Sequence, residues 1–209
     1  MEVNIFGEGA VGYKNIVKSS SSQDFFLYKK YKNYAVCTVA DGHSMDVFKY
    51  SHIGSYLACQ SVFEILKTYK LNEDIEKGEQ NFICDLKNKK VQNDIKNKWR
   101  DLVYREFYKR NYKVYKLDYM LFGTTLSFVI FLKEYIVFFN LGDSSILIKE
   151  DKDYVNVFKN NNFKFVNSLA LYNCEEKMQY SILKMNKDFK LVISTDGFIN
   201  SFETYHKLK

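Results

Sequence analysis

The sequence predicts a layered α+β domain, because strands and long helices occur in separate blocks of the chain. Short apolar runs rich in β-branched and aromatic residues gather between residues 123 and 148, where brief turns join them. Two further segments, 47–68 and 91–107, carry apolar residues at helical spacing and are not separated by a strand. Locally connected strands and consecutive helices indicate helices layered on sheets.

The individual elements follow from composition and turn signals. A β-branched run at 34–39, bounded by Lys-rich sequence and by Asp41-Gly42, predicts a strand before the helix at 47–68. The polar, acidic segment 70–80 predicts a loop before the second, basic helix. Further expected strands are 124–132, 135–141, 145–148, weaker ones at 163–171 and 179–185, and a final buried strand at 190–194, with a polar separator at 150–162.

Composition excludes several classes of protein. The 209 residues, 46% hydrophobic and 27% charged, suit a single domain over 1–209 and exclude a disordered chain. No stretch approaches 18 uninterrupted apolar residues, and the N-terminus lacks a basic segment followed by an apolar one. We therefore expect neither a membrane-spanning helix nor a signal peptide. The four cysteines form no C-x-x-C pair, which favours reduced thiols in a cytoplasmic protein.

The net charge of +6 is concentrated in one segment. Between Asp85 and Lys113 lie ten basic and four acidic residues, and the rest of the chain is balanced. Apolar residues recur at helical spacing through the same segment, so we expect an amphipathic helix whose charges form a solvated face. Binding of nucleic acid or another anionic partner is the less favoured alternative.

Three expected strands run directly into an Asp beside a Gly. The dipeptides are Asp41-Gly42, Gly142-Asp143 and Asp196-Gly197. Each alone is a common turn sequence. If the strands share a sheet system, however, the three carboxylates gather at one edge, where they repel one another unless a cation is present. Oxygen ligands suit hard divalent cations such as Mg²⁺ or Mn²⁺, so the three together favour a metal site.

Four short motifs, each attached to an expected strand, also follow one another along the chain: Asp41-Gly42-His43, Gly123-Thr124-Thr125, Gly142-Asp143-Ser144 and Ser194-Thr195-Asp196-Gly197. Their order and rough spacing resemble those of the metal-dependent type-2C protein phosphatases. Gln23-Asp24, before an aromatic run, resembles the bacterial form of that family's first motif. The resemblance covers nearly the whole chain and implies a four-layer αββα sandwich, in which helices flank two antiparallel β-sheets.

The resemblance further implies a site for two Mn²⁺ or Mg²⁺ ions. Asp41 corresponds to the carboxylate that bridges both ions, and the carbonyl oxygen of Gly42 to a further ligand. Asp24 and Asp196 resemble the flanking ligands. Asp143 matches the position associated with a third, looser ion.

The implied reaction is hydrolysis of phosphoserine and phosphothreonine in a phosphorylated protein, the expected partner. The two ions would activate a water and stabilise the attacking and leaving oxygens. His43 corresponds to a general acid, which protonates the leaving serine or threonine oxygen because an alkoxide is very basic.

Two features depart from the family pattern. Members usually carry one more metal-binding Asp beyond the Asp-Gly strand, but 201–209 contains none, so we expect a C-terminally shortened fold. Many members also place an Arg before the first Asp, for which Lys14 or Lys18 would substitute as a point charge toward substrate phosphate. An alternative therefore stays open: a degenerate phosphatase-fold module, catalytically weak or inactive, that binds a phosphoprotein or another partner.

Overall fold

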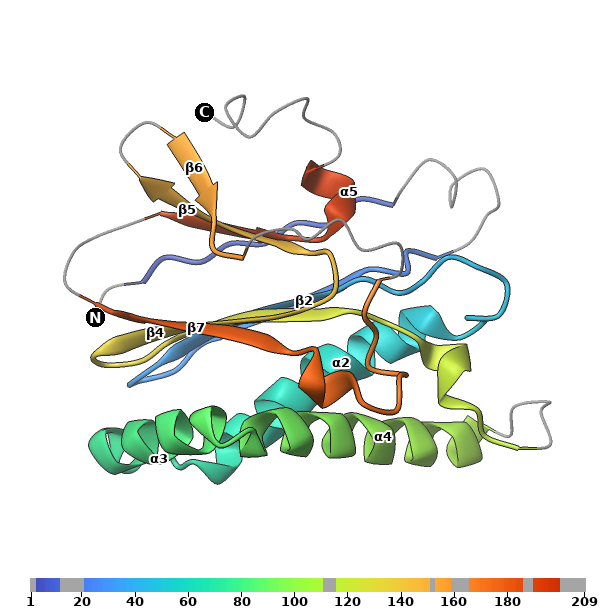
Figure 1. The fold of residues 1–209 in the computed structure, drawn as a ribbon, viewed down its shortest axis with the longest axis horizontal. Helices are drawn as coiled ribbons and strands as arrows, with labels where there is room; N and C mark the ends of the chain where they lie inside the picture. Colours follow the sequence, from blue (N-terminus) through green and yellow to red (C-terminus); the bar gives the residue numbers. More distant parts are fainter. Residues whose placement is uncertain are drawn as a thin grey trace.

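The computed structural model describes residues 3–11, 21–110, 116–150, 153–158, 166–185 and 190–199. Figure 1 shows these residues in layers, with a small sheet above a larger one and the long helices below it. No helix among them is both long and apolar enough to cross a membrane.

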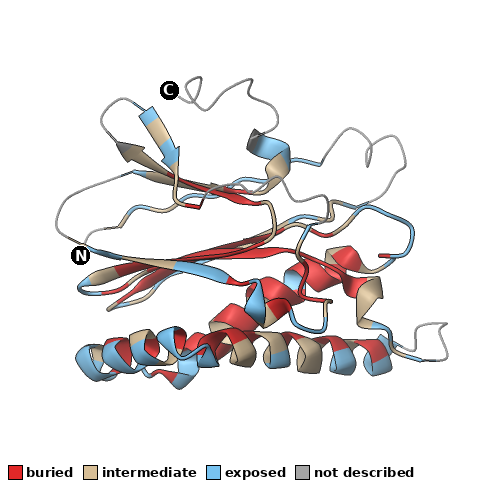
Figure 2. Ribbon diagram, viewed as in Figure 1, coloured by how far each residue is buried: buried red, intermediate tan, exposed pale blue. Residues whose placement is uncertain are grey.

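The larger sheet has five antiparallel strands in the order β1-β2-β3-β4-β7. The strands are β1 (Phe25–Lys30), β2 (Ala35–Ala40), β3 (Leu126–Phe131), β4 (Tyr135–Leu141) and β7 (Gln179–Lys184). The three central strands are buried almost throughout, whereas the two edge strands contain only partly buried and exposed positions and each ends in an exposed lysine (Figure 2). The central strands are therefore the apolar runs that the sequence marks most clearly.

The smaller sheet has three antiparallel strands in the order β6-β5-β8. They are β5 (Ser145–Glu150), β6 (Asp153–Asn156) and β8 (Leu191–Ser194). Side chains from both sheets, including Val129, Phe138 and Ile146, form a compact apolar cluster. The predicted α+β sandwich of two antiparallel sheets is confirmed.

Helices cover the other face of the five-stranded sheet. They are α2 (Ser51–Thr68), α3 (Ile75–Lys87) and α4 (Lys90–Arg110), accompanied by the single turns η1 (Tyr119–Phe122) and η2 (Cys174–Glu176). The main core lies between this layer and the sheet. Trp99 of α4 is fully buried there and donates its indole N–H to the carbonyl oxygen of Gly54 in α2, at 3.0 Å. On the side of the smaller sheet, the described residues contribute one short helix, α5 (Asp196–Ile199).

The expected loop at 70–80 is wrong in its second half, because α3 begins at Ile75. Asp74 caps this helix by accepting a hydrogen bond from the backbone N–H of Lys77 at 3.1 Å. One narrow face of α3, including Phe82 and Leu86, is buried, and the rest is polar and exposed. Because most residues of α3 are polar, the helical spacing of its few apolar residues is hard to detect in the sequence.

Three further expectations need correction. The first long helix begins at Ser51 rather than at residue 47, since the chain still turns at 45–50. The described part of the weak strand at 163–171, residues 166–171, is not a strand but ends in a turn whose Leu169 N–H donates to the carbonyl oxygen of Thr124. The final strand, β8, is mostly half-buried rather than buried.

Candidate metal centre

Asp24 and Asp41 face each other at one edge of the five-stranded sheet. Strands β1 and β2 are antiparallel, with Phe25 opposite Ala40. Asp24 immediately precedes β1 and Asp41 immediately follows β2, so the register alone brings the two residues together although 16 residues of chain separate them.

Asp143 and Asp196 reach the same place from the smaller sheet. Asp143 lies in the turn between β4 and β5, which crosses from one sheet to the other, and Asp196 follows β8. Because Ser145 pairs with Ser194 across β5 and β8, these two Asp residues lie at the same end of that sheet. The hydroxyl of Thr195 donates to a carboxylate oxygen of Asp24 at 3.2 Å, which joins the two sheets at the site.

Burial and mutual repulsion disfavour ionisation of the carboxyl groups of Asp24, Asp41 and Asp143. The pKa of Asp41 is raised, first by burial and then by the neighbouring carboxyl groups of Asp24 and Asp196. Burial is also the main cause of the raised pKa of Asp24, although hydrogen bonds from Asp41 and Thr195 oppose it. The pKa of Asp143 is raised by burial and then by the charge of Asp196. At neutral pH the cluster therefore favours a bound cation or a bound proton.

The donor set fits a hard divalent cation. A buried side-chain oxygen of Asp143, Oδ1, has no hydrogen-bond partner, which is costly unless a ligand fills the place. The carboxyl groups approach in pairs, Asp24 with Asp41 and Asp41 with Asp196. In the described part of the chain, no three His, Cys, Asp or Glu side chains are already arranged as a metal site. An ion would thus have to draw these side chains together.

The peptide after β2 is held by the start of β3. The backbone N–H of Asp41 donates to the hydroxyl of Thr125 at 2.9 Å, and the Asp41 carbonyl oxygen accepts from the N–H of Thr125 and the hydroxyl of Thr124. A β-carbon on Gly42 would lie 2.7 Å from the carbonyl oxygen of Gln23. Only glycine allows so close an approach of the two backbones.

Gln23 connects three parts of the site, a role that its place before Asp24 in the sequence did not reveal. Its side-chain amide donates to the carbonyl oxygen of His43 and to the hydroxyl of Ser51, both at 3.0 Å. Its carbonyl oxygen accepts from the N–H of Gly42 at 3.2 Å and from the hydroxyl of Ser55 at 2.6 Å. One residue therefore fixes the start of β1, the loop after β2 and the first turn of α2 relative to one another.

His43 follows Asp41 and Gly42 in the sequence. Its imidazole packs against the ring of Phe48, with the ring centroids 4.7 Å apart. Burial lowers the pKa of His43. The backbone N–H of His43 donates to the carbonyl oxygen of Gly123 at 3.1 Å, and a β-carbon on Gly123 would collide with both rings. Glycine at position 123 thus leaves the space in which the imidazole lies.

A chain of hydrogen bonds inside the sheets supports the turn that carries Asp143. The hydroxyl of Ser127 donates to the side-chain oxygen of Asn140 at 2.5 Å, and the amide of Asn140 donates to the carbonyl oxygen of Gly142 at 3.3 Å. Gly142 has a φ of +117°, which disfavours any other residue, and a β-carbon there would meet Thr125 at 2.5 Å.

The structure thus brings together the predicted residues Asp24, Asp41, Gly42, Asp143 and Asp196, with His43 adjoining Asp41 and Gly42 in the loop after β2. Lys14, Lys18 and the C-terminal segment 201–209 lie outside the described residues. Of the supporting residues, Thr195 is next to Asp196 in the sequence and Asn140 lies three residues before Asp143, but their hydrogen bonds depend on strand pairing that no local pattern reveals.

Comparison with known proteins identifies the family. The model of the protein phosphatase 2C family matches residues 11–209. No curated protein sequence gives a significant match.

Several solved structures share the fold. A serine/threonine phosphatase from S. agalactiae is 18% identical, with a TM-score of 0.58 over 90% of this chain and 78% of that one. A serine-threonine phosphatase 2C from Toxoplasma gondii is 11% identical, with a TM-score of 0.57 over 88% of this chain and 76% of the other. The catalytic domain of the phosphatase PstP, in complex with two manganese ions, is 11% identical, with a TM-score of 0.53 over 88% and 74%.

Proposed function

The chain belongs to the protein phosphatase 2C family, and from this premise we propose that it is a metal-dependent phosphatase that removes phosphate from serine and threonine residues of proteins. The observation that carries the proposal is the gathering of Asp24, Asp41, Asp143 and Asp196 at one edge of the sandwich. The raised pKa values of Asp24, Asp41 and Asp143 mark a place where negative charge is concentrated without a compensating cation.

We assign the residues as follows. The carboxyl group of Asp41 interacts with those of both Asp24 and Asp196, so Asp41 would be the ligand shared by two ions, with the Gly42 carbonyl oxygen as an additional ligand. Asp143 would hold a third ion, since its buried Oδ1 lacks a partner. Carboxylate and carbonyl oxygens suit Mn²⁺ or Mg²⁺, and the PstP domain with two manganese ions supports that choice.

Bound ions would lower the pKa of a water and stabilise charge on the phosphoryl oxygens. The remaining roles fall to the chain itself. His43 carries a proton toward the leaving oxygen, and burial lowers its pKa, so only a fraction of the imidazole is protonated at neutral pH. The imidazole is held in place by Phe48 and by the backbone bond to Gly123. Lys14 and Lys18 remain our candidates for contacting substrate phosphate, within a single domain over 1–209.

The test is release of phosphate from a phosphothreonine peptide with and without millimolar Mn²⁺. The wild-type chain should turn over only with metal, and Asp41→Asn should lose turnover in every condition. Asp94→Asn, on α4 and outside the cluster, is the matched control and should behave as wild type. Absence of turnover by the folded wild-type chain would reject the enzyme in favour of a phosphatase-fold module that only binds its partner.

A further inference from the structure

A second surface of the molecule has the composition of a protein-binding site. Arg100, Tyr104 and Tyr108 follow one another at intervals of four on α4 and therefore share one face of the helix. The two tyrosines are 51% and 57% exposed, with their ring centroids 4.6 Å apart. The guanidinium of Arg100 lies over the ring of Tyr119 in η1, 5.2 Å from its centroid.

A cleft of about 520 Å³ opens beside this face. Its lining includes Arg100, Lys116, Tyr119 and Tyr172, and Tyr172 is 86% exposed. We call Arg100, Tyr104, Tyr108, Lys116, Tyr119 and Tyr172 the tyrosine–arginine surface. It draws on three separate parts of the chain, and none of its members belongs to the candidate metal centre.

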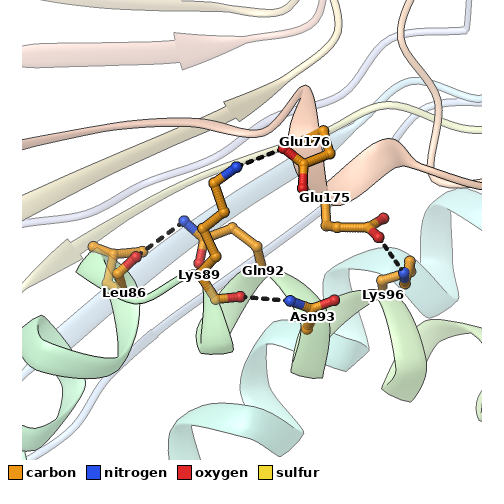
Figure 3. A network of polar contacts seen from close by, with 7 residues as sticks. All are labelled: Leu86, Lys89, Gln92, Asn93, Lys96, Glu175 and Glu176. Carbon is orange, nitrogen blue, oxygen red and sulfur yellow. Dashed lines mark hydrogen bonds and ion pairs between the residues drawn. The ribbon is translucent and has the colours of Figure 1, made fainter.

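The walls of the cleft are held in place rather than loose. Figure 3 shows two ion pairs that hold η2, the turn that follows Tyr172. Lys89, just before α4, pairs with Glu176 at 2.5 Å, and Lys96 of α4 pairs with Glu175 at 2.7 Å. Arg100 itself donates to the carbonyl oxygen of Leu171 at 3.3 Å. A preformed cleft binds a partner at a lower entropic cost than one that must be ordered on binding.

The cleft carries surplus positive charge. Neither Arg100 nor Lys116 forms an ion pair with any described residue, and the neighbouring Glu175 already pairs with Lys96. The Nε of Arg100 is buried and lacks an acceptor. Asp118 is the acidic residue of the lining, and its carboxylate accepts a hydrogen bond from the backbone N–H of Met120. The lining of the cleft therefore contains two cations and one carboxylate. A guanidinium stacked on an aromatic ring is well suited to bind a carboxylate.

We propose that the tyrosine–arginine surface docks an acidic peptide segment of a partner protein. A Glu or Asp side chain would enter the cleft toward Arg100, and neighbouring apolar residues would lie on Tyr104 and Tyr108. Tyr and Arg are enriched where interfaces contribute most of their binding energy. Nucleic acid fits less well, because Arg105 pairs with Asp101 at 2.9 Å and Arg110 pairs with Glu106 farther along α4, which interrupts a continuous basic track.

The test is selection of peptides from a random dodecapeptide phage library on the full chain. Asp or Glu together with aromatic or aliphatic residues should be enriched. The leading peptide, made synthetically with a fluorophore, should bind Arg100→Gln and Tyr104→Ser at least tenfold more weakly than wild type by anisotropy. Tyr28→Ser, an exposed tyrosine on the edge strand β1, is the matched control and should bind normally.

Circular dichroism should be unchanged in each variant. Arg100→Gln loses the bond to the carbonyl oxygen of Leu171 and should melt at a slightly lower temperature, whereas Tyr104→Ser leaves that bond intact and should melt as wild type. Enrichment of basic peptides, or binding that none of the variants weakens, would overturn the proposal. The proposal would also be overturned if a labelled single-stranded oligonucleotide binds more tightly than the selected peptide and this binding is lost in Arg100→Gln.

Discussion

The side chains of Asp24 and Asp41 lie within hydrogen-bonding reach of each other, across the paired ends of β1 and β2. Two ionised carboxylates cannot hydrogen-bond, so in the absence of metal one proton is shared at this place. Burial and the nearby Asp196 strengthen the effect, because both raise the pKa of Asp41. The carboxylates of the centre therefore repel one another, and a bound divalent cation or proton reduces this repulsion.

Replacing Asp41 with Asn should therefore stabilise the metal-free protein at neutral pH. Since the folded-state pKa of Asp41 is raised, the folded chain binds more protons than the unfolded one above about pH 4. Stability of the metal-free wild type should fall as the pH rises from there. Asp41→Asn reduces this slope and should raise the free energy of unfolding at pH 7 by on the order of 2 kcal/mol.

Urea denaturation in the presence of a chelator, between pH 5 and 8, measures this effect. Asp94→Asn serves as the control because Asp94 lies on α4, away from the cluster. If the wild type and Asp41→Asn show the same pH slope, Asp41 does not carry the shared proton.

Asp143→Ala should weaken the binding of metal ions rather than slow the chemical step. Its carboxyl group interacts with Asp196 and Asp24 from the β4–β5 turn, and its unpartnered Oδ1 suits an additional ion. The Mn²⁺ concentration for half-maximal turnover of a phosphothreonine peptide should rise about tenfold, and turnover at saturating Mn²⁺ should approach that of wild type. A loss that excess metal leaves unchanged would assign Asp143 another role.

His43→Ala should distinguish substrates by their leaving groups. A serine or threonine oxygen needs a proton as it departs, whereas the phenolate of an aryl phosphate does not. Turnover of the phosphothreonine peptide should drop by roughly 10² to 10⁴, with a much smaller loss on p-nitrophenyl phosphate. Equal losses on both substrates would mean that His43 is not a general acid.

Gln23→Met should lower metal affinity without unfolding the chain. Methionine has a similar shape but cannot donate to His43 and Ser51, so the loop that presents Asp41 and Gly42 loses its tie to α2. We expect an increase of about tenfold in the dissociation constant for Mn²⁺, measured by calorimetry. Gln179→Met, at an exposed position of β7, is the control and should bind Mn²⁺ as wild type. Unchanged affinity in a folded Gln23→Met would show that the tie is only structural.

The sequence predicts the buried elements of this fold better than the exposed ones. Strands β2, β3 and β4 are continuous apolar runs because the sheet buries them on both faces. Composition and periodicity do not reveal β6, which lies in a polar stretch, or α3, because most side chains in both face water. Pairing with β5 holds β6, and a few buried apolar residues hold α3, so neither element leaves much periodicity to detect.

The candidate ligands were predictable for a different reason. Asp41, Asp143 and Asp196 each lie within two residues of the end of a strand and next to a glycine, so the local sequence marks them. The residues that hold the ligands in place are not marked in this way. Gln23 bonds to residues 20 and 28 positions away, and Thr195 bonds across 171 positions, so only the paired sheets reveal these supports.

The measurement that tests the central claim most directly is titration of the metal-free chain with Mn²⁺ by calorimetry. We predict that wild type and Asp94→Asn bind at least two ions and that Asp41→Asn loses the site that its carboxylate bridges. Binding that is absent in wild type, or unchanged in Asp41→Asn, would contradict a metal centre built on Asp24, Asp41 and Asp196.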